Sequence, residues 1–335
     1  MRRVRRATGH AFAGAACAVS LAGCNRVQSA LAPAGDQAAA IHGIWTLMLW
    51  ICVPVYLLVL AALWFALARG RGAGHAIASD RGIERGLLLW TVVIAVLLTV
   101  LTAASYAVDR RLHAQPQRPL EVRVTAKQWW WEVSYLGADP STHFVTANEL
   151  FLPAGRPARI ELRSADVIHS LWIPALNGKE DLIPGRPNEI VMTPRKTGRY
   201  RGQCAEFCGL QHAHMALDVQ VGSADAFARW RRAQVAAAFP PTTAAAARGQ
   251  QVFLSHACAM CHAIRGTPAG AVTGPDLTHF ASRRTLAAGA LPMDRASLAA
   301  WLADPQSVKP GTDMPAVPLA PDDLAAVTEY LMELR

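Results

Sequence analysis

One short stretch of the chain gathers side chains that bind soft metal ions. Two thiols, an imidazole and a thioether lie within twelve residues, at Cys204, Cys208, His212 and Met215. Soft sulfur together with imidazole favours copper or zinc. A structural zinc site would want a second Cys/His pair at a suitable spacing, and none follows before residue 240. A C-x3-C disulfide is the alternative, but it would not explain why His212 and Met215 lie on the same loop.

A loop alone rarely surrounds a metal, so we expect one more ligand from another part of the chain. His169, in the run DVIHSLWIP, is the candidate. A lone histidine in an apolar strand is usually only a packed residue. The separation of His169 from Cys204 would, however, let two loops meet at one end of a β-barrel, as in blue-copper sites.

A second motif, Cys258-Ala-Met-Cys261-His262, has the C-x-x-C-H spacing of a c-type haem attachment site. Two thioether bonds would hold the porphyrin, and His262 would ligate the iron. A redox or zinc C-x-x-C motif is the alternative, and the adjacent histidine argues against it. For the sixth ligand we expect Met314, in a Gly/Pro loop, rather than Met293, which we expect to pack at a helix start.

Two apolar runs precede these motifs, at residues 43–68 and 87–108, and neither contains a charge. Each exceeds the roughly 20 residues that a helix needs to cross a bilayer. Arginines outnumber acidic residues in the short loop between the runs, which places this loop in the cytoplasm by the positive-inside rule. Everything after the second run is then expected outside the cytoplasm.

The N-terminus has the pattern of an export signal, with MRRVRR followed by a mostly apolar segment to residue 23. It ends in Leu-Ala-Gly-Cys, which resembles the bacterial lipobox, so we expect cleavage after residue 23 and lipidation of Cys24. The formal net charge is +9, but residues 1–119 hold 12 basic and 4 acidic side chains and so carry +8 of it. This distribution indicates targeting and membrane topology, and we expect no nucleic acid partner.

The middle of the chain is predicted to be an all-β sandwich or barrel that is closed by a helix at about 223–238. Short β-rich runs alternate there with Gly and Pro turn signals, at residues 120–134, 143–152, 157–163, 188–193, 198–203 and 215–221.

These motifs carry a resemblance to a known family. The pattern C-x-E-x-C-x3-H-x2-M, the earlier D-V-x-H-S, the run K-Q-W-W-W and the two upstream spans resemble subunit II of haem–copper cytochrome c oxidases, over about residues 40–222. The resemblance implies a cupredoxin-like Greek-key β-barrel that holds the binuclear copper centre CuA.

The resemblance also implies roles for single residues. Cys204 and Cys208 would be bridging thiolates, and His169 and His212 terminal ligands. Met215 would be a weak ligand, and Glu206 would bind copper through its backbone carbonyl and magnesium through its side chain. Trp129 would be the point at which electrons enter from cytochrome c. His214 is a rival imidazole, but the spacing from Cys208 favours His212.

The C-terminal part resembles an all-α class I cytochrome c. Gly274-Pro275 resembles the segment whose proline carbonyl orients the proximal histidine, and an apolar periodicity predicts a terminal helix over 321–334. The whole chain is therefore expected to be a membrane-anchored multidomain protein. Its parts would be a signal peptide (1–23), a transmembrane hairpin (24–112), a CuA domain (115–237) and a cytochrome c domain (242–335).

Taken together, these resemblances imply a subunit II of a bacterial cytochrome c oxidase with a fused cytochrome c domain. Electrons would pass from an external cytochrome c or an upstream respiratory complex to haem c, then to CuA and to subunit I, where oxygen is reduced to water and protons are pumped. Subunits I and III and membrane lipid are the expected partners, and magnesium would lie at the interface with subunit I. This chain itself would supply no catalytic acid, base or nucleophile.

Two alternatives remain at this point, and two other families do not fit. A membrane-tethered copper–haem carrier outside an oxidase, or a copper-storage or assembly protein, would use the same ligands. A quinol oxidase subunit II would lack the copper ligands, and a nitrous oxide reductase would need a large additional domain.

Overall fold

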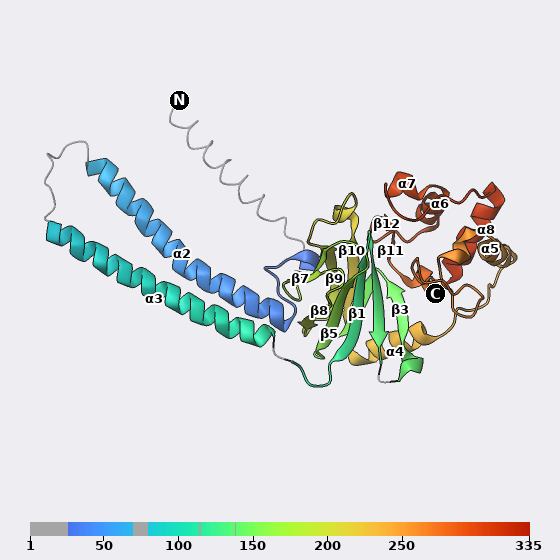
Figure 1. Cartoon of the computed structure of the whole chain (residues 1–335), viewed down its shortest axis with the longest axis horizontal. Coiled ribbons are helices and arrows are strands. Elements are labelled where there is room, and N and C mark those ends of the chain that lie inside the picture. The colour runs from blue at the N-terminus through green and yellow to red at the C-terminus, as the bar shows by residue number, and fades with distance from the viewer. Residues whose placement is uncertain (1–25, 70–79, 114, 138) are drawn as a thin grey trace, which may run out of the picture.

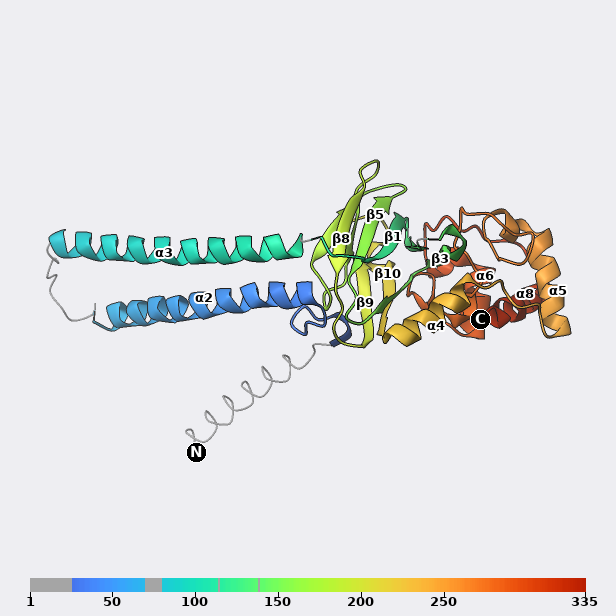
Figure 2. The same ribbon diagram turned by 90° about the horizontal axis from the view of Figure 1, so that it is seen from below.

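The computed structural model describes residues 26–69, 80–113, 115–137 and 139–335, and these form three parts (Figure 1). Two long helices extend away from a β-sheet domain, and a smaller, mainly helical domain packs on the other side of the sheets (Figure 2). The expected signal peptide and the expected lipidation site Cys24 lie outside the described residues.

The two helices, α2 (Asp36–Arg69) and α3 (Asp80–Leu112), contain the predicted apolar runs. Their most apolar windows have a mean hydropathy of 2.5 and 2.6, and no residue of either window is buried within the chain. Both helices are long and apolar enough to cross a membrane. These two helices indicate that the chain is membrane-anchored.

The start of α2 is attached directly to the β domain. Ala38 donates its backbone N–H to the carbonyl of Leu176 (3.1 Å), and the side-chain oxygen of Gln37 accepts from the N–H of Thr193 (2.9 Å). The Asp36 carboxylate also pairs with Arg195. The helix therefore starts from a fixed point on the β domain.

Two five-stranded sheets form the β domain, in the orders β3-β2-β1-β5-β8 and β4-β10-β9-β6-β7. Alternate residues of the strands point inward, as Val122, Val124 and Ala126 of β1 do, and these are at most 1% exposed. The strand bounds are β1 Leu120–Lys127, β2 Trp130–Leu136, β3 Phe144–Ala147, β4 Glu149–Pro153, β5 Ala158–Ser164, β6 His169–Trp172, β7 Lys179–Leu182, β8 Asn188–Met192, β9 Gly198–Cys204 and β10 Ala216–Gly222.

Two of the expected β runs are each divided between two strands. The run 120–134 turns back at Gln128–Trp129, so β1 and β2 pair as antiparallel neighbours. The run 143–152 breaks at Asn148, whose φ of 60° takes the chain from β3 in one sheet to β4 in the other. The short strand β7 has no counterpart among the expected runs, because its sequence KEDL has no apolar alternation.

Helix α4 (Ala224–Val235) covers one end of the sheets. Its N-cap is Ser223, whose hydroxyl accepts from the N–H of Ala226 (3.2 Å). The helix ends three residues before the expected residue 238. Phe227 and Trp230 pack against the aromatic rings of the β-domain core, including Tyr135.

The C-terminal domain is built mainly of helices around its own core. Its longest helices, α5 (Ala244–Ser255) and α8 (Pro321–Glu333), cross at Gly249, where a Cβ would lie 2.0 Å from the carbonyl oxygen of Ala326. Between them lie α6 (Arg295–Ala303), α7 (Pro305–Val308) and a two-residue hairpin of β11 (Thr285–Leu286) and β12 (Leu291–Pro292). Apart from this hairpin, the domain has the helical architecture that the sequence predicts.

Candidate metal centre and haem site

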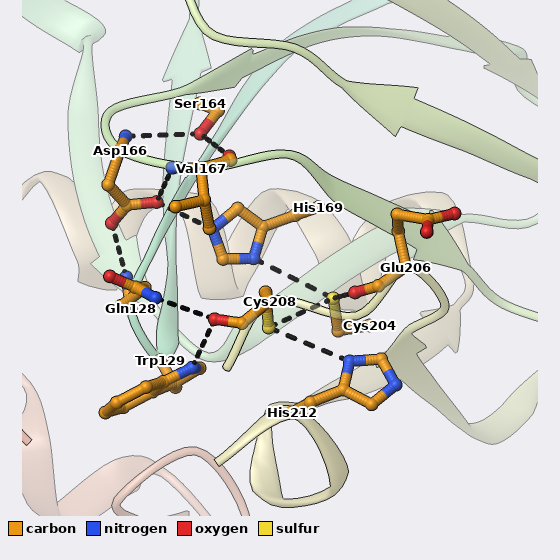
Figure 3. Close-up of polar contacts among 10 residues, drawn as sticks. All are labelled: Gln128, Trp129, Ser164, Asp166, Val167, His169, Cys204, Glu206, Cys208 and His212. Atoms are coloured by element: carbon orange, nitrogen blue, oxygen red, sulfur yellow. Dashed lines mark hydrogen bonds and ion pairs between the residues drawn. The ribbon is translucent and has the colours of Figure 1, made fainter. Parts of the chain in front are cut away.

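The chemistry-bearing side chains of the β domain meet at one end of its second sheet (Figure 3). Cys204 ends β9, and His169 begins the neighbouring strand β6; the two strands pair through Leu171 and Cys204. Cys208 follows in the loop after β9, and His212 begins a 3₁₀ turn (His212–His214). Strand pairing therefore brings residues that are 35 positions apart in the chain to the same place.

Two sulfurs and two ring nitrogens form a continuous cluster. The Cys204 and Cys208 Sγ atoms are 3.7 Å apart, Cys204 Sγ lies 3.7 Å from His169 Nδ1, and Cys208 Sγ lies 3.7 Å from His212 Nδ1. The ligand atoms of His169, Cys204 and Cys208 all lie within 4.8 Å of one another, and all three residues are buried. The Glu206 carbonyl oxygen is 3.2 Å from Cys204 Sγ.

The two thiols do not ionise independently. A hydrogen bond with Cys208 lowers the pKa of Cys204 to about 3, and the same hydrogen bond, together with burial, raises the pKa of Cys208 far above its usual range. Two adjacent thiolates in a buried site therefore need a cation beside them. The donor set fits a copper pair, because two soft sulfurs lie side by side with one imidazole nitrogen next to each and a carbonyl oxygen next to Cys204.

A carboxylate fixes the orientation of His169. His169 Nε2 lies 2.7 Å from Asp166 Oδ1, which leaves Nδ1 facing the sulfurs. Burial lowers the pKa of His169, but its contacts with Cys204 and Asp166 outweigh burial and raise it overall. A carboxylate on the far nitrogen of a ligating histidine holds the ring in place and increases its basicity.

Three further residues of the loop have distinct environments. Met215 is buried, and its carbonyl accepts the N–H of Cys204 (3.1 Å). His214 Nδ1 lies 2.9 Å from Gln211 Oε1, so that His212 rather than His214 contacts a thiol. The Glu206 carboxylate points away from the sulfurs and lies 3.4 Å from Lys179 Nζ.

Trp129 lies beneath the loop and not on an open surface. Its indole N–H donates to the carbonyl of Cys208 (2.9 Å), to which the side chain of Gln128 also donates (2.7 Å). Only 7% of Trp129 is exposed. Gly311 of the C-terminal domain packs on the indole, since a Cβ on Gly311 would lie 3.3 Å from Trp129 Cη2.

In the C-terminal domain, the motif residues surround a histidine of defined orientation. Cys258 lies in a 3₁₀ turn (Ala257–Met260), and the N–H of His262 donates to its carbonyl (3.0 Å). His262 Nδ1 lies 2.8 Å from the carbonyl oxygen of Pro275, as the sequence comparison with class I cytochromes suggests. Burial lowers the pKa of His262, which favours a neutral imidazole with Nε2 free to bind iron.

The two candidate methionines are both half-buried and pack against the core of this domain. Gln306 holds the Met314 loop by donating to the carbonyls of Thr312 (2.7 Å) and Met314 (3.2 Å) and by accepting from the N–H of Gly311 (2.9 Å). The choice of Met314 as the sixth ligand stays a prediction.

Sequence reasoning missed Lys309, which lies at the contact between the two domains. It is 2% exposed, and its ammonium reaches both domains. Burial lowers the pKa of Lys309 to about 7, whereas the nearby Cys208 raises it. The sequence does contain one feature that singles out Lys309. It is the last of only four lysines, and it stands directly before the Pro-Gly of the Met314 loop.

Comparison with known proteins gives a family for each of the two domains. A family model described as the periplasmic domain of cytochrome c oxidase subunit II matches residues 137–222, and a cytochrome c model matches residues 246–335. These two families imply a CuA centre and a c-type haem as cofactors.

Individual relatives extend the similarity. Cytochrome c oxidase subunit 2 of Alkalihalophilus pseudofirmus is 32% identical over 317 residues, which cover 92% of this chain and 91% of that protein. The subunit 2 of Bacillus sp. (strain PS3) is 32% identical over 267 residues, or 74% of each chain. The crystal structure of the periplasmic domain of subunit II (CoxB) of Bradyrhizobium japonicum is 33% identical, with a TM-score of 0.33, and covers 36% of this chain and 95% of that one. Because the first of these similarities spans nearly all of both proteins, the chain belongs to the cytochrome c oxidase subunit II family.

Proposed function

We propose that this chain takes electrons from an external donor through a haem c at Cys258, Cys261 and His262. It passes them through CuA in the β domain to the haem–copper centre of subunit I. The observation that carries the proposal is the pair of sulfurs, Cys204 and Cys208, flanked by His169 on one side and His212 on the other. The C-terminal domain packs beside this cluster. Copper held by sulfur and imidazole and iron in a c-type haem each exchange single electrons. Oxygen reduction to water and proton pumping then belong to subunit I.

The residues around the cluster hold it in one geometry. Asp166 orients His169, and both Gln128 and Trp129 donate to the Cys208 carbonyl, so the ligand loop is fixed from two sides. A site that does not rearrange when an electron arrives suits electron transfer better than bond making. Met215 is assigned as a weak ligand and the Glu206 carbonyl as a further one.

Cys258 and Cys261 are assigned the thioether bonds to the haem, and His262 the proximal position. The Pro275 carbonyl holds Nδ1 of His262, so Nε2 is the nitrogen that faces the iron. Met314 is assigned the sixth position, in a loop that Gln306 holds by three hydrogen bonds.

The Glu206 side chain is assigned to a magnesium ion shared with subunit I. Its carboxylate is about half-exposed and points out of the copper loop, while its own carbonyl points in. A carboxylate in this position could bind a hard cation without competing for the copper.

The arrangement of the chain in the cell follows from the same assignment. A lipid on Cys24 and the two helices would hold the chain in a bacterial plasma membrane, with the N-terminus and both globular domains on the extracytoplasmic side. Subunits I and III would surround the helices, which accounts for their exposed apolar side chains. An external cytochrome c or an upstream respiratory complex would donate the electrons.

Cys208→Ser tests this function. The variant, purified with its oxidase complex, should lose the mixed-valence copper signal in electron paramagnetic resonance and keep the haem c optical spectrum, because the two sites use different residues. Cys52→Ser, an exposed thiol of α2, is the matched control and should keep both signals. Retention of the copper signal in Cys208→Ser, or purification of the wild-type chain without subunit I, would contradict the proposal.

A further inference from the structure

The contact between the β domain and the C-terminal domain contains a buried cation. Lys309 Nζ donates to three carbonyl oxygens, those of Trp129 (2.7 Å), His214 (2.9 Å) and Ala287 (3.0 Å). Trp129 and His214 belong to the metal-binding end of the β domain, whereas Ala287 belongs to the C-terminal domain. A single side chain therefore joins three segments across the domain boundary.

Burying an ammonium group costs free energy unless hydrogen bonds within the protein replace those it makes with water. An ammonium group has three donors, and all three are used here. Among the residues that the structure describes, no carboxylate forms an ion pair with Lys309. Without a counter-charge the buried ammonium depends on these carbonyls, and two of its three hydrogen bonds, those to Trp129 and His214, exist only when the two domains are docked.

The residues next to Lys309 make the contact specific. Pro310 accepts from the side chain of Gln211 (2.8 Å), and Gly311 packs on the indole of Trp129. Nearby, the N–H of Ala216 donates to the carbonyl of Ala288 (3.0 Å). The loop that carries Met314 is thereby held against the tryptophan that is itself hydrogen-bonded to Cys208.

We propose that Lys309 is a positioning residue that holds the cytochrome domain in one docked orientation on the Trp129 side of the copper loop. The inference rests on the proposed function, because it assigns the docked orientation to electron transfer between haem c and CuA. It also has a consequence for the donor. The chain's own domain covers Trp129, so an external cytochrome c delivers electrons to the haem domain and not to the copper loop.

The first test needs no bound copper. In the full chain prepared without copper, amide hydrogen exchange is measured for peptides that contain residues 128–131, 209–216 and 286–289. Lys309→Met keeps the length of the side chain but removes the donors, and should accelerate exchange in all three segments by about tenfold or more. Lys309→Gln, which retains two N–H donors, should give a smaller increase.

Arg284→Gln is the matched control. Arg284 also crosses the domain boundary, since it pairs with Asp218 (3.3 Å), but it is half-exposed and should contribute little. Exchange in Arg284→Gln should match the wild type. Equal exchange rates in Lys309→Met and the wild type would overturn the proposal. If Lys309→Met does not fold, hydrogen exchange of the wild type still tests the proposal. The three segments should then open together at one rate, and independent opening would contradict a single docked orientation.

The second test uses the loaded complex. Haem c is reduced by a flash, and the rate of one-electron transfer from the reduced haem to the oxidised copper pair is measured. This rate should fall by about tenfold or more in Lys309→Met, because the cytochrome domain is held less firmly on the β domain. The haem c optical spectrum and the copper resonance signal should not change. An unchanged rate would overturn the proposal. Absence of copper from the wild type would instead contradict the proposed function, and the exchange experiment would still report on the dock.

Discussion

At the scale of single residues, the candidate copper ligands are held by side chains that we do not assign as ligands. Asp166 contacts the far nitrogen of His169 and also accepts the N–H of Gln128 (2.6 Å), so one carboxylate links the ligand to the turn that carries Trp129. Trp129 and Gln128 in turn hold the Cys208 carbonyl. The candidate ligands are therefore oriented by neighbours from two turns, Asp166 between β5 and β6 and Gln128 and Trp129 between β1 and β2.

Asp166→Asn should weaken copper binding. The amide can no longer attract the Nε2 proton of His169 as a carboxylate does, so the ring loses both its fixed tautomer and part of its basicity. Loss of such a partner lowers metal affinity by about 10- to 100-fold. Competition titration with a copper chelator measures the change. Asp225→Asn, an exposed carboxylate in α4, should bind copper like the wild type, and equal affinities in both variants would rule out the role of Asp166.

Several of these residues could be identified from the sequence, because their types and spacing are local properties. Cys204, Cys208, His212 and the C-x-x-C-H motif stand out in this way. The roles of Asp166 and Gln128 could not be predicted, since a carboxylate or amide in a turn has many possible partners. Only the paired strands show which one it has.

At the scale of elements, strand pairing and helix crossing place the two sites. The pairing of β6 with β9 brings His169 to the thiol loop, and the division of the run 120–134 into β1 and β2 puts Trp129 in a turn beneath it. The sequence predicts most of the strands, because buried and exposed residues alternate along them. It does not predict the turn at Trp129, since the aromatic run continues the apolar pattern through it, and it does not predict β7.

Gly249→Ala should destabilise the cytochrome domain. The new Cβ would lie 2.0 Å from the Ala326 carbonyl oxygen, so α5 and α8 would have to move apart. Overpacking costs about 1–3 kcal/mol or more, which exceeds the roughly 1 kcal/mol that alanine gains over glycine in a helix. Thermal melting followed at a haem absorption band should show a lower midpoint. Gly270→Ala, where a Cβ would contact nothing within 4 Å, is the control, and a Gly249→Ala midpoint as high as that of the control would contradict the prediction.

At the scale of the whole molecule, the cytochrome domain is docked on the β domain by buried polar groups as well as by Lys309. Arg283 of the C-terminal domain reaches Glu149 of β4, with Nε 3.9 Å from the carboxylate, and both side chains are largely buried. Thr146 also donates to Glu149 (2.5 Å). Burial raises the pKa of Glu149, an effect that Arg283 opposes and Asp218 reinforces, and burial lowers the pKa of Arg283.

The raised pKa of Glu149 predicts a pH dependence of stability. Between the ordinary carboxyl pKa and the raised one, the folded protein keeps a proton that the unfolded chain has already lost. The contribution of Glu149 to the free energy of unfolding is therefore full below the ordinary pKa and falls as pH rises through the raised pKa. Calorimetry of wild type and Glu149→Gln from about pH 4 to about pH 8 measures it. The difference in melting temperature between the two should change across this window, and parallel profiles would contradict the assignment.

The sequence by itself indicates the metal-binding side chains, the order of the domains and two helices long and apolar enough to cross a membrane. Each of these follows from residue types at short spacings or from the apolar content of continuous runs. Only the tertiary structure decides that Trp129 is covered, that Lys309 joins the two domains, and that Glu149 meets Arg283. The reason is physical: a buried polar group is stable only beside the partners that satisfy its hydrogen bonds, and these partners come from segments far apart in the chain.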